Sequence, residues 1–177
     1  YLIAAKKVAE NSIRFFKKDG RFITFSITGN TLFHPHCYAS EGYYASGKYF
    51  NNQLYLDISK ESTLYLFENL LDNGGMPQIF FGDNFIEFER SDILAQTLRM
   101  GALFYEYIDN AKLEKLKKRL LEFQIKEGDQ KGGFLYGYDD KGKKYNNANS
   151  WCTMFSIQAL LLLENRNYLE DVGLIIV

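Results

Sequence analysis

The sequence has little of several features that mark common functional classes. Only two of its 177 residues are cysteines, Cys37 and Cys152, and their wide separation indicates neither a zinc site nor a disulfide framework. We expect both to be buried free thiols. Lysine and arginine total 21 against 22 acidic residues, with no polybasic run, which excludes a typical nucleic-acid partner. Apolar runs such as FSIQALLLLE fall short of the roughly 18–20 residues that span a bilayer, so we predict no transmembrane segment.

Several catalytic signatures are missing as well. The chain has no G-x-S-x-G and no H-E-x-x-H, and no Gly-Lys-Ser/Thr follows its paired glycines. Covalent serine chemistry, zinc peptidase chemistry and a phosphate loop are therefore not predicted, and neither is a cofactor. The neighbouring Cys37 and His36 give only weak support to cysteine catalysis. The unpaired cysteines and the lack of a visible signal peptide favour a cytoplasmic protein.

Aromatic residues, in contrast, are abundant. The chain contains 15 Phe, 13 Tyr and one Trp, which together make 16% of its residues. Tyrosine combines an apolar ring face with a polar tip. This composition suits a core that opens into a wet groove.

A repeated unit is the most informative feature of the sequence. Glycine-containing breaks follow helix-like segments at Gly20, Gly75 and Gly133, at intervals of 55 and 58 residues. After each break, aromatic and β-branched residues flank a Gly, Asn or Asp turn, which is typical of a short β-hairpin. The three predicted hairpins are RFITFSITGNTLF (21–33), QIFFGDNFIEFER (78–90) and GFLYGYDDKGKKYN (133–146).

Each predicted hairpin is followed by a helix. We expect these helices to begin near His36, near Ser91 and near Ser150, with Asp, Ser and Asn supplying N-cap chemistry in the last two. Their many small residues favour close helix packing, so we interpret them as an inner set. The segments 52–71 and 112–127 read as outer helices, since the second places leucines on one face and lysines on the other.

Three such units predict an all-α protein: a partial α/α toroid of about three helical hairpins, with short β-hairpins before the inner helices. The copy DQKGGFLYGYDDKGKKYNNANSWCTMFSIQALLLLE and the stretch HPHCYASEGYY resemble the six-hairpin (α/α)6 toroid superfamily of carbohydrate-active proteins. The resemblance implies a single toroid domain over residues 1–177 and a relation to glycoside hydrolases, polysaccharide lyases and sugar epimerases. It also implies a substrate funnel where inner-helix N-termini and hairpin loops meet.

Six hairpins would need about twice this length. Either a longer chain supplies the missing half, or two copies pair to complete the ring. We favour the first, because the sequence begins with Tyr1 and its start looks truncated. An oligomer is expected if missing chain does not complete the toroid.

The candidate site residues lie at the first turns of the inner helices, where free backbone N–H groups and the helix dipole favour anionic or sugar ligands. The predicted catalytic residues are His36, Tyr38, Glu41 and Asp92, and the predicted substrate-binding residues are His34, Arg90, Gln96, Asn149 and Trp151.

The histidines and Glu41 also have structural interpretations. His34 and His36 flank Pro35 and could form a metal pair, but no third ligand stands at a fixed spacing, so we predict no metal site. They could instead cap the helix or bond to a loop carbonyl. Glu41 could be a functional acid or the partner of an arginine, Arg90 or Arg99.

The remaining candidates have structural interpretations too. Asp92 is more often an N-cap in such a position than a general base, and Asn149 is most simply the cap of its helix. Trp151 could lie in the core or provide a flat face for a sugar ring.

The leading functional hypothesis is an enzyme acting on a poly- or oligosaccharide, with uronate polymers favoured because Arg90 could clamp a carboxylate. Hydrolysis would use Glu41 and Asp92 as a carboxylate pair. Lyase or epimerase chemistry would use His36 or Tyr38 to move a proton, with Arg90 or Asn149 neutralising the carboxylate. The alternatives are a non-catalytic glycan- or partner-binding module and an isoprenoid-handling toroid.

Overall fold

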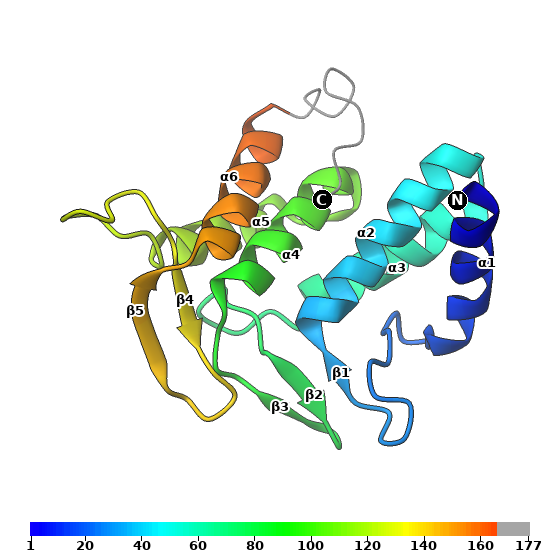
Figure 1. Ribbon diagram of the computed structural model, residues 1–177, viewed down its shortest axis with the longest axis horizontal. Helices are drawn as coiled ribbons and strands as arrows, with labels where there is room; N and C mark the ends of the chain where they lie inside the picture. The colour runs from blue at the N-terminus through cyan, green and yellow to red at the C-terminus, as the bar shows by residue number, and fades with distance from the viewer. Residues whose placement is uncertain (166–177) are drawn as a thin grey trace.

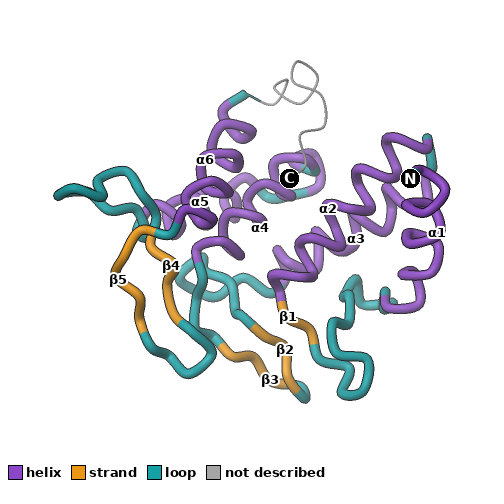
Figure 2. Tube along the Cα trace, in the orientation of Figure 1, coloured by secondary structure: helices purple, strands orange, loops and turns teal. Residues whose placement is uncertain are grey.

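The computed structural model describes residues 1–165, so the last twelve residues of the predicted 1–177 domain lie outside the described part. Helices and short strands alternate along the chain (Figures 1 and 2). The helices are α1 (Leu2–Ser12), α2 (Phe33–Phe50), α3 (Gln53–Glu68), α4 (Ser91–Leu103), α5 (Asn110–Leu121) and α6 (Ser150–Glu164), with single 3-10 turns at Ile13–Phe15 and Tyr105–Tyr107. The strands are β1 (Thr31–Leu32), β2 (Ile79–Phe81), β3 (Asn84–Ile86), β4 (Leu135–Tyr138) and β5 (Lys144–Ala148).

Helices α2, α4 and α6 form an inner row, with α4 in the middle (Figure 1). Helix α4 packs against both α2 and α6, and all of its residues from Ser91 to Ala102 are buried. Helix α3 packs on α2 and α5 packs on α4, and α5 is an amphipathic helix with Leu113, Leu116 and Leu120 turned inward. The predicted alternation of inner and outer helices is confirmed.

Two of the three predicted hairpins are present. Strands β2 and β3 pair across a turn at Gly82 and Asp83, both with positive φ, as such a turn requires. Strands β4 and β5 pair with one irregularity between Leu135 and Gly137.

The first predicted hairpin, residues 21–33, is wrong. Its only strand is β1, which pairs with β2 of the next unit (Thr31 opposite Phe80, Leu32 opposite Ile79), and the rest of the segment is loop with isolated bridges. The free edge of β2 offers Thr31 and Leu32 a partner that keeps this short segment against the core, with Thr31 fully buried.

The inner helices begin where their N-terminal groups find partners. Helix α2 begins at Phe33, three residues before the predicted start, because the Gln78 carbonyl accepts a hydrogen bond from the Phe33 N–H at 2.9 Å. Pro35 is tolerated in this first turn, where an N–H has no intrahelical partner anyway. Helices α4 and α6 begin at Ser91 and Ser150 as predicted.

The core is continuous between the two helix layers. Its largest cluster joins α2, α4, α5 and α6 and includes Phe33, Leu94, Leu98, Leu116 and Phe155, each 1% exposed or less. A smaller aromatic cluster lies between α1, α2 and α3. Cys37 and Cys152 are free and buried, which confirms that prediction. No helix among the described residues is long and apolar enough to cross a membrane.

Candidate functional site

The three inner helices each present side chains at the same spacing. On each helix, residues four and then three positions apart share one face, because an α-helix has about 3.6 residues per turn. We call the nine side chains the inner stripe; its three levels are His34, Asp92 and Trp151 (first), Tyr38, Gln96 and Phe155 (second), and Glu41, Arg99 and Gln158 (third). Contacts across the helices hold these levels together.

The first level contains a histidine–carboxylate pair. Nδ1 of His34 lies 3.3 Å from Oδ2 of Asp92, and the two side chains are 19% and 1% exposed. Burial lowers the pKa of His34, an effect that Asp92 and Gln96 partly oppose and Arg90 adds to. The lowered pKa favours the neutral imidazole over its charged form.

Arg90 binds both oxygens of the Asp92 carboxylate. Its guanidinium donates two hydrogen bonds, from Nε to Oδ1 at 3.1 Å and from one terminal nitrogen to Oδ2 at 2.6 Å. The guanidinium also lies over the Tyr136 ring, 4.7 Å from its centre. Asp92 is therefore not the N-cap of α4: Arg90 occupies that position, and Asp92 lies two residues into the helix.

The second level is aromatic with one buried amide. The Tyr38 ring packs edge-on against His34, at 4.7 Å between centres, and against Phe155 at 6.0 Å. Burial raises the pKa of the Tyr38 phenol, while hydrogen bonding to Trp151 and Gln96 partly offsets the rise. The side chain of Gln96 is fully buried, and its amide makes no hydrogen bond of good geometry within the described residues.

The third level is an ion pair. Glu41, 1% exposed, lies 3.3 Å from Nε of Arg99, which also donates a 2.7 Å hydrogen bond to Gln158. Burial raises the pKa of Glu41 to about 7, although the Arg99 charge opposes the rise. The structural interpretation of Glu41, a pairing with Arg99, matches this geometry.

His36 lies outside the inner stripe, which corrects the grouping of His36 with Tyr38 and Glu41. It is fully buried; Nδ1 accepts a hydrogen bond from the Phe22 N–H at 3.1 Å, and Nε2 donates to the Ser62 carbonyl at 2.9 Å. Burial lowers its pKa to about 4. The structure gives His36 a place in the core between α2 and α3, where no nitrogen is left for a substrate.

The two remaining predicted residues, Asn149 and Trp151, lie at the start of α6 and have different roles. Asn149 caps α6 through its side-chain oxygen, which accepts a 3.0 Å hydrogen bond from the Cys152 N–H. Trp151 packs edge-on against Phe155 and is 46% exposed, so the first level opens to solvent beside it. Among the described residues no three His, Cys, Asp or Glu side chains are grouped to hold a metal ion.

Sequence reasoning missed Tyr136, Phe155 and Gln158 as parts of this arrangement. The spacing of four and three residues, identical on the three helices, was a signal that could have found the last two. Tyr136 enters from β4, which bridges to the chain just before α4 by an Arg90–Gly137 pairing, and no linear pattern indicates that contact.

Comparison with known proteins shows which fold the chain resembles. A scan against protein-family models and a search of curated proteins found no match. Solved structures do match, among them an unsaturated glucuronyl hydrolase from Bacillus sp. GL1, with a TM-score of 0.69, 15% identity, and coverage of 89% of this chain and 51% of that one. The cellobiose 2-epimerase of Bacillus thermoamylovorans B4167 gives 0.65, 14%, 87% and 46%. A D-mannose isomerase gives 0.65, 16%, 95% and 48%.

The chain is similar in fold to (α/α)6 toroid proteins. These similar toroids are carbohydrate-active proteins, as the sequence resemblance implied. The chain spans about half the length of the toroids it matches.

Proposed function

We propose that this protein acts on an oligo- or polysaccharide at the first level of the inner stripe, as a single toroid domain that contributes about three helical hairpins of a ring. The observation that carries the proposal is the pairing of His34 with Asp92, clamped by Arg90 and opening beside the exposed Trp151. The toroids with similar structures are named for hydrolysis, epimerisation or isomerisation of sugars.

Proton transfer at a sugar carbon is the chemistry that this geometry supports best. Asp92 lies beside Nδ1 of His34, and the lowered pKa of His34 favours the neutral imidazole, which is the form that accepts a proton. Tyr38 lies against the His34 ring and could carry a second proton. We therefore assign to His34 the role that the sequence suggested for His36.

Glycoside hydrolysis by Glu41 and Asp92 is the alternative chemistry. A pKa of about 7 would keep much of Glu41 protonated, as a general acid requires. However, Glu41 is 1% exposed and pairs with Arg99, two helical turns below His34. Asp92 lies at the first level and is also 1% exposed, so this version requires two buried carboxylates to reach one substrate bond.

An acidic substrate remains part of the proposal. One toroid with a similar structure is named for glucuronyl compounds, whose carboxylate an arginine could bind. Arg90 already donates two hydrogen bonds to Asp92, so it would have to share its guanidinium between Asp92 and the ligand. Uronate sugars therefore belong in the assay beside neutral ones.

The isoprenoid alternative has less support. An isoprenoid-handling toroid would need a cluster of acidic metal ligands. The adjacent aspartates Asp139 and Asp140 instead stand on the β4–β5 turn, where Asp139 accepts hydrogen bonds from the N–H groups of Lys141 and Lys143. A non-catalytic glycan-binding module is the remaining alternative, and the assay described next distinguishes it from an enzyme.

The test measures turnover and binding of cellobiose, D-mannose and an unsaturated glucuronyl disaccharide. We expect the wild-type chain to convert at least one of them, and His34→Asn and Asp92→Asn to lower kcat/KM by about 100-fold or more. Asp57→Asn is the matched control, because Asp57 is half-exposed on α3 and pairs only with neighbours on its own helix. Binding without turnover would indicate the module, and the absence of both in folded wild-type protein would overturn the proposal.

A further inference from the structure

Buried polar atoms without a hydrogen-bond partner are concentrated in the inner stripe. Among the described residues, most of the buried side-chain nitrogen and oxygen atoms that make no hydrogen bond of good geometry belong to His34, Glu41 and Gln96. Folded proteins leave few such atoms unpaired, and each one needs an explanation. We therefore looked in the stripe for a polar role beyond packing.

Gln96 is the clearest case. Its side chain is fully buried, and neither atom of its amide has such a partner within the described part of the chain. A buried amide without hydrogen bonds opposes folding, and an apolar side chain of the same length would remove this cost. Packing alone therefore does not account for a glutamine at this position.

The Gln96 amide lies beside two groups that can exchange protons. Burial is the largest influence on both, lowering the pKa of His34 and raising that of Tyr38, and Gln96 opposes each of these effects. A hydrogen bond that lowers the pKa of a phenol is one that the phenol oxygen accepts, so the amide N–H faces Tyr38. The amide oxygen faces His34, because it favours the charged imidazole. Gln96 thus lies between the two groups.

Trp151 makes a second contact with the Tyr38 hydroxyl. It lies in the first turn of α6, and its hydrogen bond with Tyr38 also opposes the rise in pKa that burial causes. An indole N–H can only donate, so the Tyr38 oxygen is the acceptor. The Tyr38 ring packs edge-on against His34 at 4.7 Å and against Phe155 at 6.0 Å between ring centres. Side chains of all three inner helices therefore meet at this phenol.

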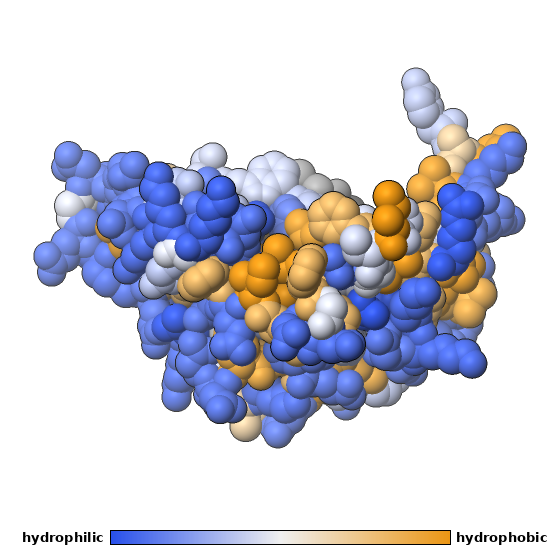
Figure 3. Space-filling model, turned by 90° about the horizontal axis from the view of Figure 1, so that it is seen from below, coloured by the Kyte–Doolittle hydropathy of each residue, from blue (hydrophilic) through white to orange (hydrophobic). Residues whose placement is uncertain are grey.

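The hydrogen bonds to the Tyr38 oxygen determine what its proton can do. Two donors occupy both lone pairs of a phenol oxygen and leave the O–H proton available to an acceptor. The inner helices begin at the hairpin end of the molecule, where Figure 3 shows hydrophobic atoms at the centre, opposite the hydrophilic β4–β5 side. Apolar surroundings strengthen hydrogen bonds, including those that stabilise a phenolate.

We propose that Gln96 and Trp151 are positioning residues for Tyr38: both donate to its oxygen and thereby direct its proton towards the substrate. When Tyr38 acts as an acid, its O–H bond breaks, a lone pair of a substrate oxygen takes the proton, and the bonding electrons stay on the phenolate. The two donors stabilise that negative charge. Such hydrogen bonds are often long in a free enzyme and tighten when substrate binds, which accounts for the unpaired amide.

The inference rests on the proposed proton transfer and refines it. Tyr38 exchanges its proton with a substrate oxygen, whereas His34 accepts the proton bound to carbon. Gln96 joins the two groups through the opposite ends of its amide.

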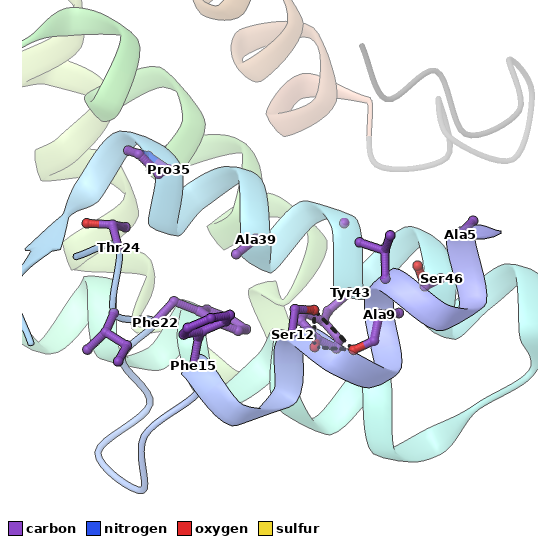
Figure 4. Close-up of a pocket in the computed structure, with 13 residues that line it drawn as sticks. Ala5, Ala9, Ser12, Phe15, Phe22, Thr24, Pro35, Ala39, Tyr43 and Ser46 are labelled. Carbon is purple, nitrogen blue, oxygen red and sulfur yellow. Dashed lines mark hydrogen bonds between the residues drawn. The ribbon is translucent and has the colours of Figure 1, made fainter. Parts of the chain in front are cut away.

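The single tryptophan of the chain allows the contact with Trp151 to be measured without any activity. Isotope labelling of the indole nitrogen gives one N–H signal in an NMR spectrum. We expect Tyr38→Phe, which removes only the hydroxyl, to move this signal upfield and to speed its exchange with solvent. Tyr43→Phe is the matched control, because the Tyr43 hydroxyl lies on another face of α2, donates to the Ala9 carbonyl and contacts the Ser12 hydroxyl (Figure 4). A signal that Tyr38→Phe leaves unchanged would overturn the proposal.

Gln96→Met tests the amide, because methionine is an unbranched apolar side chain that fills the same space. If Gln96 only packs, this substitution should keep or raise stability and leave the ionisation of Tyr38 unchanged. We expect the pKa of Tyr38 to rise instead, as followed by NMR of ring-labelled tyrosine with the Tyr38 signal assigned from Tyr38→Phe. The Tyr43 signal should stay where it is. An unchanged Tyr38 pKa in folded Gln96→Met would overturn the proposal.

The charged groups around the phenol are the same in wild type and variant. Burial is the largest cause of the raised Tyr38 pKa, and the carboxylates of Glu41 on α2 and Asp92 on α4 add to it. His34 of α2 also faces the ring, and α6 presents uncharged aromatic side chains. Because these groups keep their places in Gln96→Met, their effects cancel in the difference between the two proteins.

Activity separates this inference from the proposed function. On a glycan that the wild type converts, Gln96→Met and Trp151→Phe should lower kcat by about tenfold or more and change KM by less than about threefold. NMR shifts as expected in a chain that converts no glycan would leave the positioning standing and remove the proposed function. Turnover of a glycan with kcat unchanged in both variants would leave the proposed function standing and overturn the positioning.

Discussion

At the scale of the residue, His34 and His36 show how two positions along a helix decide a side chain's chemistry. They are separated by about 200° around α2, so His34 faces Asp92 on α4 while His36 faces the Ser62 carbonyl on α3. His34 is partly exposed to solvent. His36 is a core residue with two backbone partners.

Replacing each histidine by alanine should separate these roles. We expect His36→Ala to lower the free energy of unfolding by about 2–4 kcal/mol, because it removes a buried ring and leaves the Phe22 N–H without its acceptor. His34→Ala should cost less than about 1 kcal/mol, since its side chain is partly exposed. Urea unfolding measures both, and equal losses would contradict the assignment.

Glu41 should make stability depend on pH. Its pKa is raised from 4.5 to about 7 by burial, so the folded chain binds a proton more tightly than the unfolded chain. Stability from this group is therefore greatest below pH 4.5 and declines as pH rises towards 7, by up to about 3 kcal/mol at 1.36 kcal/mol per pKa unit.

Glu41→Gln tests this directly, because it removes the titration and keeps the shape. The difference in unfolding free energy between Glu41→Gln and wild type should shift in favour of the variant between pH 4.5 and 8. His36 acts oppositely, destabilising the fold as pH falls from 6.5 towards 4, but it is common to both proteins and cancels in the difference. A difference that stays constant with pH would show that Glu41 titrates normally.

At the scale of the element, the two glycines of α2 lie in different surroundings. Gly42 points at open space, whereas a Cβ at Gly47 would lie 2.7 Å from the Leu56 side chain and 3.0 Å from its backbone nitrogen. Close approach of α2 and α3 thus depends on Gly47, while Gly42 has no such constraint within one chain.

Alanine at the two positions should have opposite effects. We expect Gly42→Ala to raise the free energy of unfolding by about 0.5–1 kcal/mol through helix propensity, since Gly42 lies in the middle of α2. Gly47→Ala should lower it by about 1–3 kcal/mol because Leu56 must move. Chemical denaturation midpoints measure the pair, and two stabilising substitutions would show that the α2–α3 contact is looser than described.

The sequence predicts which helices and strands form better than it predicts which segments pair with each other. Hydrophobic periodicity and turn residues located the inner helices, the outer helices and the two hairpins with turns at Gly82 and Gly142. The segment 21–33 has the same local pattern as a hairpin, but pairing with β2 depends on an edge that another unit supplies. Likewise, the Arg90–Asp92 clamp joins neighbours in sequence and could be foreseen, whereas setting His34 opposite Asp92 requires the register between α2 and α4.

At the scale of the whole molecule, the inner row of α2, α4 and α6 brings three sequence-distant segments to one place. His34 and Asp92 come from different units and lie side by side at the N-terminal ends of α2 and α4, and Trp151 lies in the first turn of α6, in the third unit.

Trp151 provides the most direct measurement of the central claim, because it is the single tryptophan of the chain and stands at the open first level. We predict a saturable change in its fluorescence on titration with at least one of cellobiose, D-mannose and the unsaturated glucuronyl disaccharide, with affinity weakened about tenfold or more in Asp92→Asn. Asp57→Asn should bind as wild type does. Emission that stays constant with all three sugars, or an affinity that Asp92→Asn leaves unchanged, would contradict a sugar site at the meeting point of the three inner helices.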